Sequence, residues 1–119
     1  MSDSILTSTK KILGIEDDYT AFDAVIITHI NSVFSILNQM GIGPDIGFSI
    51  EDNEATWDTF LGDDLRLSSV KTYMYLRVRM LFDPPTTSYL IGAMKEQIQE
   101  IEWRLNTQRE GVSWTDPTV

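Results

Sequence analysis

The fold of this chain is decided by residues 70–105, VKTYMYLRVRMLFDPPTTSYLIGAMKEQIQEIEWRL, which contain two helical patterns separated by a rigid corner. The first pattern ends at Asp83, because a residue that precedes proline is disfavoured in the α region. Pro85 has no backbone N–H to donate, so no helix continues through it. Residues 86–88, Thr-Thr-Ser, are residue types that cap a new helix. The stretch therefore predicts a helix, a corner and a second helix.

Three further helices are predicted before this corner. A short helix spans residues 5–13 and stops at Gly14, since glycine readily ends helices. A long helix follows the polar connector, and a third, short helix is expected over residues 54–61. The helix that leads into the corner is apolar almost all round. Such a helix is expected to be buried, or to contact a partner as well as its own core.

The long second helix is the clearest of the set, and it runs to Gly41. We expect Thr20 to be its N-cap, with Asp23 three residues later in a near match to a capping box. Phe22, Val25 and the apolar residues that follow at helical spacing fall on one face. That face is expected to be buried.

The five helices predict an all-α fold, a small bundle of about four to five helices. Residues 41–53 are rich in glycine and include a proline, and they form a long loop after the second helix. Long loops in small domains often carry function or contacts. After Asn106 the apolar pattern is lost. We therefore divide the chain into a helical domain over residues 1–106 and an extended C-terminal tail over residues 107–119.

Length and composition exclude several classes of protein. A chain of 119 residues is one domain by length. It has no cysteine, which excludes disulfides and thiolate metal sites. No apolar run approaches the ~18 residues of a membrane helix. The N-terminus lacks the basic and apolar regions of a signal peptide. We therefore expect a protein that does not enter a membrane.

The acidic charge is concentrated in the first half of the chain. Residues 1–64 hold 12 acids and two bases, net −10, and residues 65–119 hold six acids and seven bases, net +1, which together give −9. An acidic protein repels the phosphate backbone, which argues against a protein that wraps nucleic acid. This uneven distribution of charge has two possible roles. It either keeps the protein soluble or favours head-to-tail assembly, in which an acidic face of one copy meets a neutral-to-basic face of the next.

No catalytic, cofactor or metal site is expected. His29 is the single histidine, and a zinc site needs more ligands of that kind. The chain has no Gly-x-Ser-x-Gly motif for a nucleophile. Residues 41–44, Gly-Ile-Gly-Pro, lack the lysine of a phosphate-binding loop. The acidic residues 51–54 resemble a calcium loop in composition but lack its central glycine and late glutamate.

Three residues point to contacts with other chains. Arg77 lies in the apolar stripe of its helix and needs a partner, which an internal salt bridge or a neighbouring chain could supply. Trp103 lies roughly opposite the stripe of the last helix, where it either forms an interface or folds back onto the corner. Trp114 either anchors a neighbouring chain or docks on its own domain. The full set of candidate interface residues is Phe48, Tyr75, Arg77, Arg79, Trp103, Arg104 and Trp114.

Residues 70–85, followed by residues 98–105, resemble the head–tail connector (adaptor) proteins of tailed bacteriophages with long tails. The most distinctive part is residues 81–85, Leu-Phe-Asp-Pro-Pro, placed directly before a helix. The short first helix, the long second helix and the segment 57–60, Trp-Asp-Thr-Phe, fall in the expected order. The resemblance covers about residues 5–106.

The resemblance implies a structural protein of the virion without catalytic residues. Members of this family form a ring, usually of twelve copies, that docks under the portal. The ring extends the DNA channel and offers a platform to a head-completion (stopper) or tail protein. Genomic DNA would pass without sequence-specific binding, which suits an acidic protein because a basic lining would hold it. The expected location is the head–tail interface, and the host cytoplasm during assembly.

Two other functions are weighed against this one. An acidic regulatory protein that binds another protein, such as a DNA-mimic inhibitor, would carry a continuous acidic face, whereas here the acids gather in loops and at helix starts. A small hydrolase would need a site that the sequence lacks. For ring closure we expect apolar anchors such as Tyr75 and Trp103 to supply most of the affinity. The acids Asp52, Glu54, Asp58, Asp63 and Asp64 would meet the bases Arg66, Lys71, Arg79, Arg104 and Arg109.

Overall fold

The computed structural model describes residues 4–44, 46–62 and 66–113, and only the backbone of residues 107–113. Within this part of the chain the protein is all-α, as predicted. Its helices are α1 (Ile5–Leu13), α2 (Asp23–Gln39), α3 (Trp57–Leu61), α4 (Leu67–Phe82) and α5 (Ser88–Ser113). The single β pairing among the described residues is an isolated bridge between Ser4 and Thr56.

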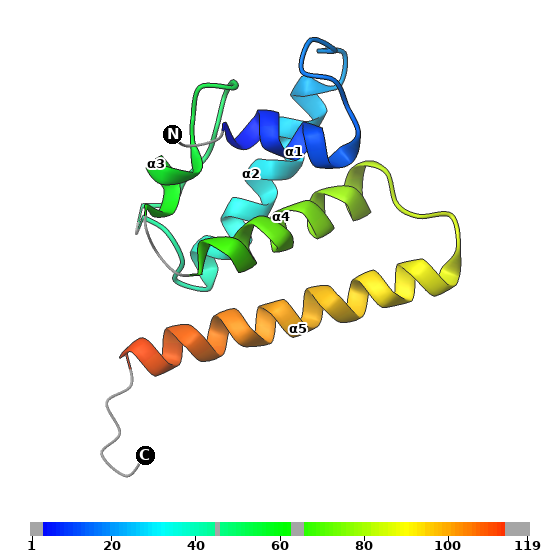
Figure 1. Cartoon of the computed structure of the whole chain (residues 1–119). Coiled ribbons are helices and arrows are strands. Elements are labelled where there is room, and N and C mark those ends of the chain that lie inside the picture. Colours follow the sequence, from blue (N-terminus) through cyan, green and yellow to red (C-terminus); the bar gives the residue numbers. More distant parts are fainter. Residues whose placement is uncertain (1–3, 45, 63–65, 114–119) are drawn as a thin grey trace.

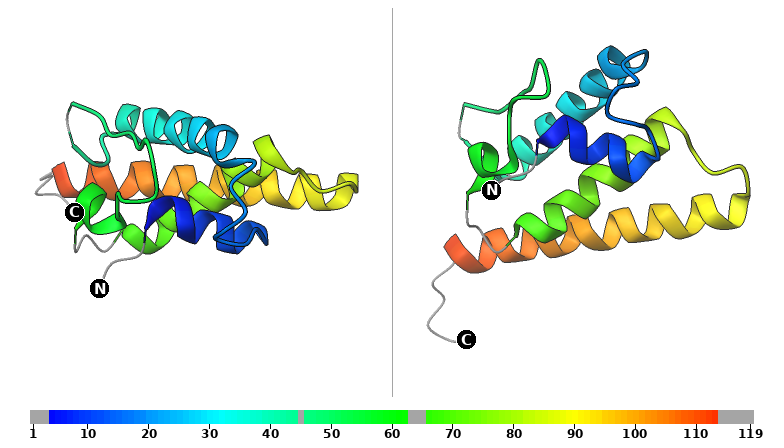
Figure 2. Two further views of the ribbon diagram at one scale, coloured as in Figure 1. Left: turned by 90° about the horizontal axis from the view of Figure 1, so that it is seen from above. Right: turned by 45° about the horizontal axis from the view of Figure 1, so that its top comes forward.

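Helix α4 is the centre of the molecule and packs against α1, α2 and α5. In Figure 1, α1 and α2 lie on the upper side of α4, and α5 lies below it and runs in the opposite direction. The loop before α3 and α3 itself cover the left-hand end. Figure 2 shows that α5 reaches beyond the other helices. The fold is therefore a packed group of four helices with one long helix laid along its lower side.

Apolar side chains of α1, α2 and α4 fill the core. The side chains with no exposed surface include Ile5 of α1, Ile26, Ile30, Val33 and Leu37 of α2, and Val70, Tyr73, Met74 and Val78 of α4. Burying one such aliphatic side chain contributes about 1.5–3 kcal/mol relative to leaving it in water. The expectation that α4 is buried is confirmed, because it has a neighbour on more than one side.

The predicted corner is confirmed. Helix α4 ends at Phe82 and α5 begins at Ser88. The backbone N–H of Leu90 donates to the hydroxyl of Thr87 at 3.3 Å, so Thr87 caps the new helix. The two prolines thus end α4, and the chain turns there so that α5 runs back along α4.

The loop after α2 is fixed to the core by aromatic rings and by one asparagine. The ring of Phe48 packs on those of Phe34 and Phe60, with centroids 5.0 and 5.2 Å apart. The side chain of Asn31 accepts from the backbone N–H of Ile50 at 2.8 Å and donates to the Ile50 carbonyl at 3.0 Å. The side-chain oxygen and nitrogen of Asn31 therefore both form hydrogen bonds with the backbone of Ile50, in the way that a residue on a neighbouring β-strand would.

Two helix starts differ from the prediction. Helix α2 begins at Asp23 with Phe22 at the N-cap and no side-chain cap. Thr20 offers its carbonyl instead, which accepts from the Asp23 N–H at 3.2 Å. Helix α3 begins at Trp57, later than expected, because Thr56 caps it with its hydroxyl. A side-chain cap is therefore present at the start of α3 but not at the start of α2.

Helix α5 ends at Ser113, beyond the end predicted at Asn106. Residues 107–113 are helical, so the prediction that the extended tail begins at residue 107 is wrong for these residues. The physical reason is propensity: Gln108, Arg109 and Glu110 are good helix formers even without an apolar stripe. Trp114 lies outside the described residues.

Candidate protein-interaction surfaces

Lys10 is buried, with only 2% of its surface exposed, and the sequence reasoning missed it. Its ammonium group donates to the carbonyl oxygens of Asp17 at 3.1 Å and Tyr19 at 2.8 Å. It also forms an ion pair with the Asp23 carboxylate at 2.9 Å. A buried charge without such partners would cost several kcal/mol. Lys10 therefore fixes the connector between α1 and α2. The sequence did contain a sign of this burial, because Lys10 lies one turn after Leu6 on the same, buried face of α1.

The fixed connector presents an aromatic patch, which we define as Tyr19, Phe22, Val25 and Phe82. The ring of Phe22 lies 5.6 Å from that of Tyr19 and 5.2 Å from that of Phe82, between centroids. Tyr19 is 50% exposed, Phe22 41% and Val25 47%. The prediction that Phe22 and Val25 lie on a buried face is wrong, because the first turn of α2 projects past the core.

A polar cluster joins α4 to α5 and contains Arg77. One carboxylate oxygen of Glu102 accepts from the hydroxyl of Tyr73 at 2.7 Å and from the guanidinium of Arg77 at 2.8 Å. The Nε of Arg77 also donates to the Tyr73 hydroxyl at 3.1 Å. Of the two partners considered for Arg77, the structure provides the internal one.

The cluster also sets the protonation of its members. Burial, together with the hydrogen bond to Glu102, raises the pKa of Tyr73 to about 12. Burial lowers the pKa of Arg77, but its hydrogen bond to Tyr73 and the charge of Glu102 outweigh this and leave that pKa above its ordinary value. At neutral pH the link therefore consists of a neutral phenol, a cation and a carboxylate acceptor.

The other candidate residues on α4 and α5 also have partners in their own chain. Arg79 donates to the hydroxyl of Tyr75 at 3.0 Å and to the carbonyl of Asp83 at 3.3 Å, so it closes the C-terminus of α4. Arg104 pairs with Glu100 one turn earlier at 2.6 Å. These contacts position the side chains, and whether they also contact other chains stays a prediction.

Trp103 is the most open of the candidates that the structure describes, with 68% of its surface exposed. The indole does not fold back onto the corner. Tyr89, 80% exposed, lies on the same outer face of α5 four turns earlier. Phe48 has the opposite placement, since its ring packs on Phe34 and Phe60 of the same chain. In its loop the open apolar side chain is Ile46, which is 98% exposed.

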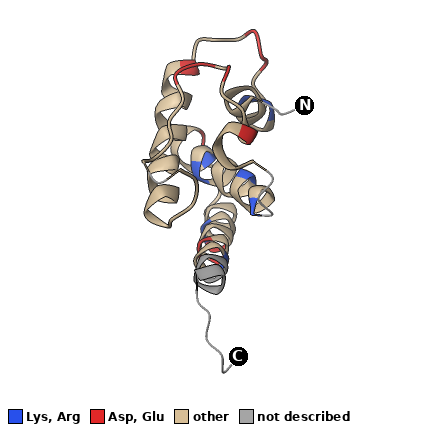
Figure 3. Ribbon diagram, turned by 90° about the vertical axis from the view of Figure 1, so that its left-hand side faces the viewer, with Lys and Arg blue, Asp and Glu red and all other residues tan. Residues whose placement is uncertain are grey.

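Charged residues do not form one continuous acidic face in the described part of the chain. Figure 3 shows the acids mainly on the connecting loops and on α5, and the bases on α1, α4 and α5. The exposed acids of the loop before α3 are Glu51, Asp52 and Glu54. The surface is thus divided between an acidic upper side and a mixed lower side.

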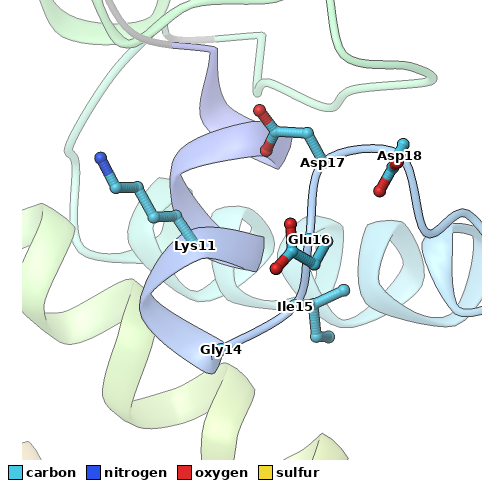
Figure 4. Close-up of a pocket in the computed structure, with 6 residues that line it drawn as sticks. All are labelled: Lys11, Gly14, Ile15, Glu16, Asp17 and Asp18. Carbon is cyan, nitrogen blue, oxygen red and sulfur yellow. The ribbon is translucent and has the colours of Figure 1, made fainter.

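A shallow hollow of about 500 Å³ lies beside the connector after α1. Figure 4 shows the Lys11 side chain pointing away from those of Glu16, Asp17 and Asp18, so no acid–base pair converges there. No group of three or more side chains suited to a metal ion occurs among the residues that the structure describes. In the same part of the chain, no helix is long and apolar enough to cross a membrane.

Comparison with known families, curated proteins and solved structures gives one match. Neither the curated proteins nor the solved structures compared with the chain give a match. The family model described as phage connector protein matches residues 5–112, from the first turn of α1 almost to the end of α5. The match confirms the resemblance inferred from residues 70–105. The chain therefore belongs to the phage connector protein family, which makes it a component of a phage virion.

Proposed function

We propose that this protein is the head–tail connector (adaptor) of a tailed phage. It forms a ring of roughly twelve copies below the portal, extends the DNA channel and gives a platform for head completion and tail attachment. The observation that carries the proposal is the family match over residues 5–112, which covers the described helices apart from the last residue of α5. The partners are other copies of the chain, the portal protein, and a head-completion (stopper) or tail protein.

The distribution of exposed apolar groups supports assembly. The aromatic patch at the first turn of α2, the outer face of α5 with Trp103, and Ile46 on the loop before α3 lie on different elements. A ring of identical copies needs two different surfaces on each copy that match each other. A chain with several separate apolar surfaces can meet neighbours in the ring and partners above or below it.

The polar clusters support a structural role over catalysis. Lys10 is fully engaged in holding the connector, and Glu102 in joining α4 to α5. Lys10 is buried, and Arg77 and Glu102 line only an open groove between α4 and α5, so neither cluster presents a reactive group inside an enclosed pocket. The protein then acts by assembly alone.

The charge of the chain suits a channel through which DNA slides. With a net charge of −9, the ring does not hold a phosphate backbone, so genomic DNA passes without sequence-specific binding. A DNA-mimic inhibitor would need a continuous acidic face, and the acids here gather on loops. The protein is placed in the host cytoplasm during assembly and at the head–tail interface of the finished virion.

A binding experiment with the portal protein of the same phage tests the proposal. Purified chain and purified portal should co-sediment as one complex, and the connector should not bind an unrelated ring protein of similar charge. If the chain fails to bind the portal but inhibits a DNA-binding enzyme at equal stoichiometry, the inhibitor function replaces this one.

A further inference from the structure

One apolar side chain of the loop after α2 projects into solvent between two buried residues. Ile46 is 98% exposed, whereas Ile42 and Ile50 on either side of it are 1% and 3% exposed. The Gly47 N–H donates to the Pro44 carbonyl at 2.9 Å, which closes a tight turn at this point. Gly47 has φ +92°, a conformation that favours glycine. Both arms of the loop are anchored to the core. The loop therefore loses little conformational entropy when Ile46 binds a partner.

A groove of about 260 Å³ lies between α4 and α5. Its apolar walls include Met80 and Leu81 from α4 and Ile98 from α5. Leu81 is 53% exposed, so the groove is open to solvent. Lys95 and Gln99 line its α5 side, and Lys95 has no ion pair within the described residues. Arg77 and Glu102, which pair with each other, also line the groove. The groove thus offers apolar walls, an internal ion pair and the unpaired positive charge of Lys95.

The turn and the groove lie on opposite sides of the molecule. In Figures 1 and 2, the loop before α3 is at one end of the molecule, and the last turn of α4 is at the other. A projecting group on one side and a recess on the other are the two surfaces that a head-to-tail ring requires. The charges agree, since the arm after the turn carries the exposed acids Glu51 and Asp52, which are complementary to Lys95.

We propose that Ile46 of one copy inserts into the α4–α5 groove of the next copy. The proposal rests on the proposed function, because it describes how the ring closes. The aromatic patch is another apolar surface near that end, but the acids Asp17 and Asp18 directly precede its Tyr19. Like charges there would repel the acidic loop, so the groove is the better receptor.

Cysteine cross-linking tests the contact directly, because the natural chain has no cysteine. Two double variants pair Ile46→Cys with Leu81→Cys on one wall of the groove, or with Gln99→Cys on the other. A disulfide needs Cα atoms about 4.4–6.8 Å apart, so it reports close contact alone. After mild oxidation of assembled protein, both pairs should give a covalent ladder beyond the dimer. The matched control pairs Ile46→Cys with Phe22→Cys and should give no ladder.

A second variant tests the same contact without a cross-link. Ile46→Asp should keep the helical circular dichroism of the natural chain, since the side chain is exposed, and should lower ring formation at least tenfold. Ser49→Asp, exposed in the same loop, is the control and should assemble normally.

The outcomes separate this proposal from the proposed function. If rings form but the groove pairs give no ladder, or if the Phe22 pair gives one, the contact is wrong and the connector function stands. Normal ring formation by Ile46→Asp also overturns the contact. If the natural chain forms no ring, alone or on the portal, the connector function fails and the contact fails with it.

Discussion

Helices α4 and α5 lie side by side, but they differ in how much of their surface is buried. Helix α4 buries side chains against α1, α2 and α5, and Val70, Met74 and Val78 have no exposed surface. Helix α5 is longer and leaves its outer face open, with Trp103 68% exposed. The comparison teaches that stability of the single copy is concentrated in α4. The outer face of α5 adds little to that stability and is available to other chains.

The largest expected effect is in the core of α4. Met74→Ala should lower the free energy of unfolding by about 2–5 kcal/mol, because it removes buried methylenes and leaves a cavity. Thr72→Ala, on the exposed side of the same helix, should change it by less than about 0.5 kcal/mol. Denaturant unfolding followed by circular dichroism measures both. Equal effects would mean that the stability of the single copy does not come from the buried face of α4.

The next effect concerns the link between them and depends on pH. Since the Tyr73 pKa of about 12 lies above the ordinary value of about 10, the folded state favours the protonated phenol. The resulting stabilisation is complete below pH ~10 and is lost as pH rises through about 12, amounting to about 3 kcal/mol for two pKa units.

Tyr73→Phe should therefore reduce the decrease in the free energy of unfolding that occurs as the pH rises above about 10. Tyr89→Phe is the matched control, because Tyr89 is 80% exposed, and it should leave the pH profile unchanged. Unfolding free energies measured between pH ~9 and ~12 decide the matter. An unchanged slope in Tyr73→Phe would mean that the polar cluster does not join the helices as described.

On α5 the expected effect moves from stability to assembly. Trp103→Ala should change the free energy of unfolding by about 0.5 kcal/mol at most. It should weaken ring formation by about 2 kcal/mol, or about 30-fold, since exposed tryptophans are enriched at interface hot spots. Glu96→Ala, on the same outer face, is the control. The readout is the amount of protein bound to particles, with circular dichroism as the test of folding.

Arg79→Ala should impair assembly less than Trp103→Ala. Exposed charges contribute about 0–1 kcal/mol per pair, and Arg79 already donates to Tyr75 and Asp83 of its own chain. The division between apolar anchors and orienting charges is wrong if Trp103→Ala assembles normally while charge reversal at Arg79 abolishes assembly.

The smallest expected effect is that of salt on the finished ring. Screening shortens the range of charge interactions from about 10 Å at 0.1 M to about 3 Å at 1 M salt. Added salt should therefore slow assembly several-fold, because charges guide the encounter, and change dissociation by less than about twofold. Light scattering during assembly and after dilution separates the two rates. If added salt speeds dissociation but leaves the assembly rate unchanged, the charges are part of the buried contact and do not guide the encounter.

The corner between α4 and α5 could be predicted because proline acts through local covalent geometry. Residues 83–85 restrict their own backbone whatever the tertiary structure. Helical periodicity also predicted that Trp103 lies opposite the apolar stripe, but it left open whether the indole is exposed or folds back onto the corner. These features are local, so a single sequence contains them.

Features that depend on distant backbone could not be predicted in the same way. The partners of Lys10 are carbonyl oxygens of a connector whose path no pattern specifies. Glu102 and Arg77 are 25 residues apart, so the sequence left the internal and the inter-chain partner open. Phe22 was assigned to a buried face because periodicity gives the face of a helix but not where its neighbour ends.

The central claim is that this chain acts by forming a ring through surfaces outside the α4 core. The most direct measurement is the native mass of the purified protein, alone and with the portal protein. We predict a complex that contains roughly twelve copies of the 13.5 kDa chain, at least on the portal, and its loss in Trp103→Ala with the fold intact. A mass of one chain under both conditions, at concentrations well above those of assembly, would contradict the account.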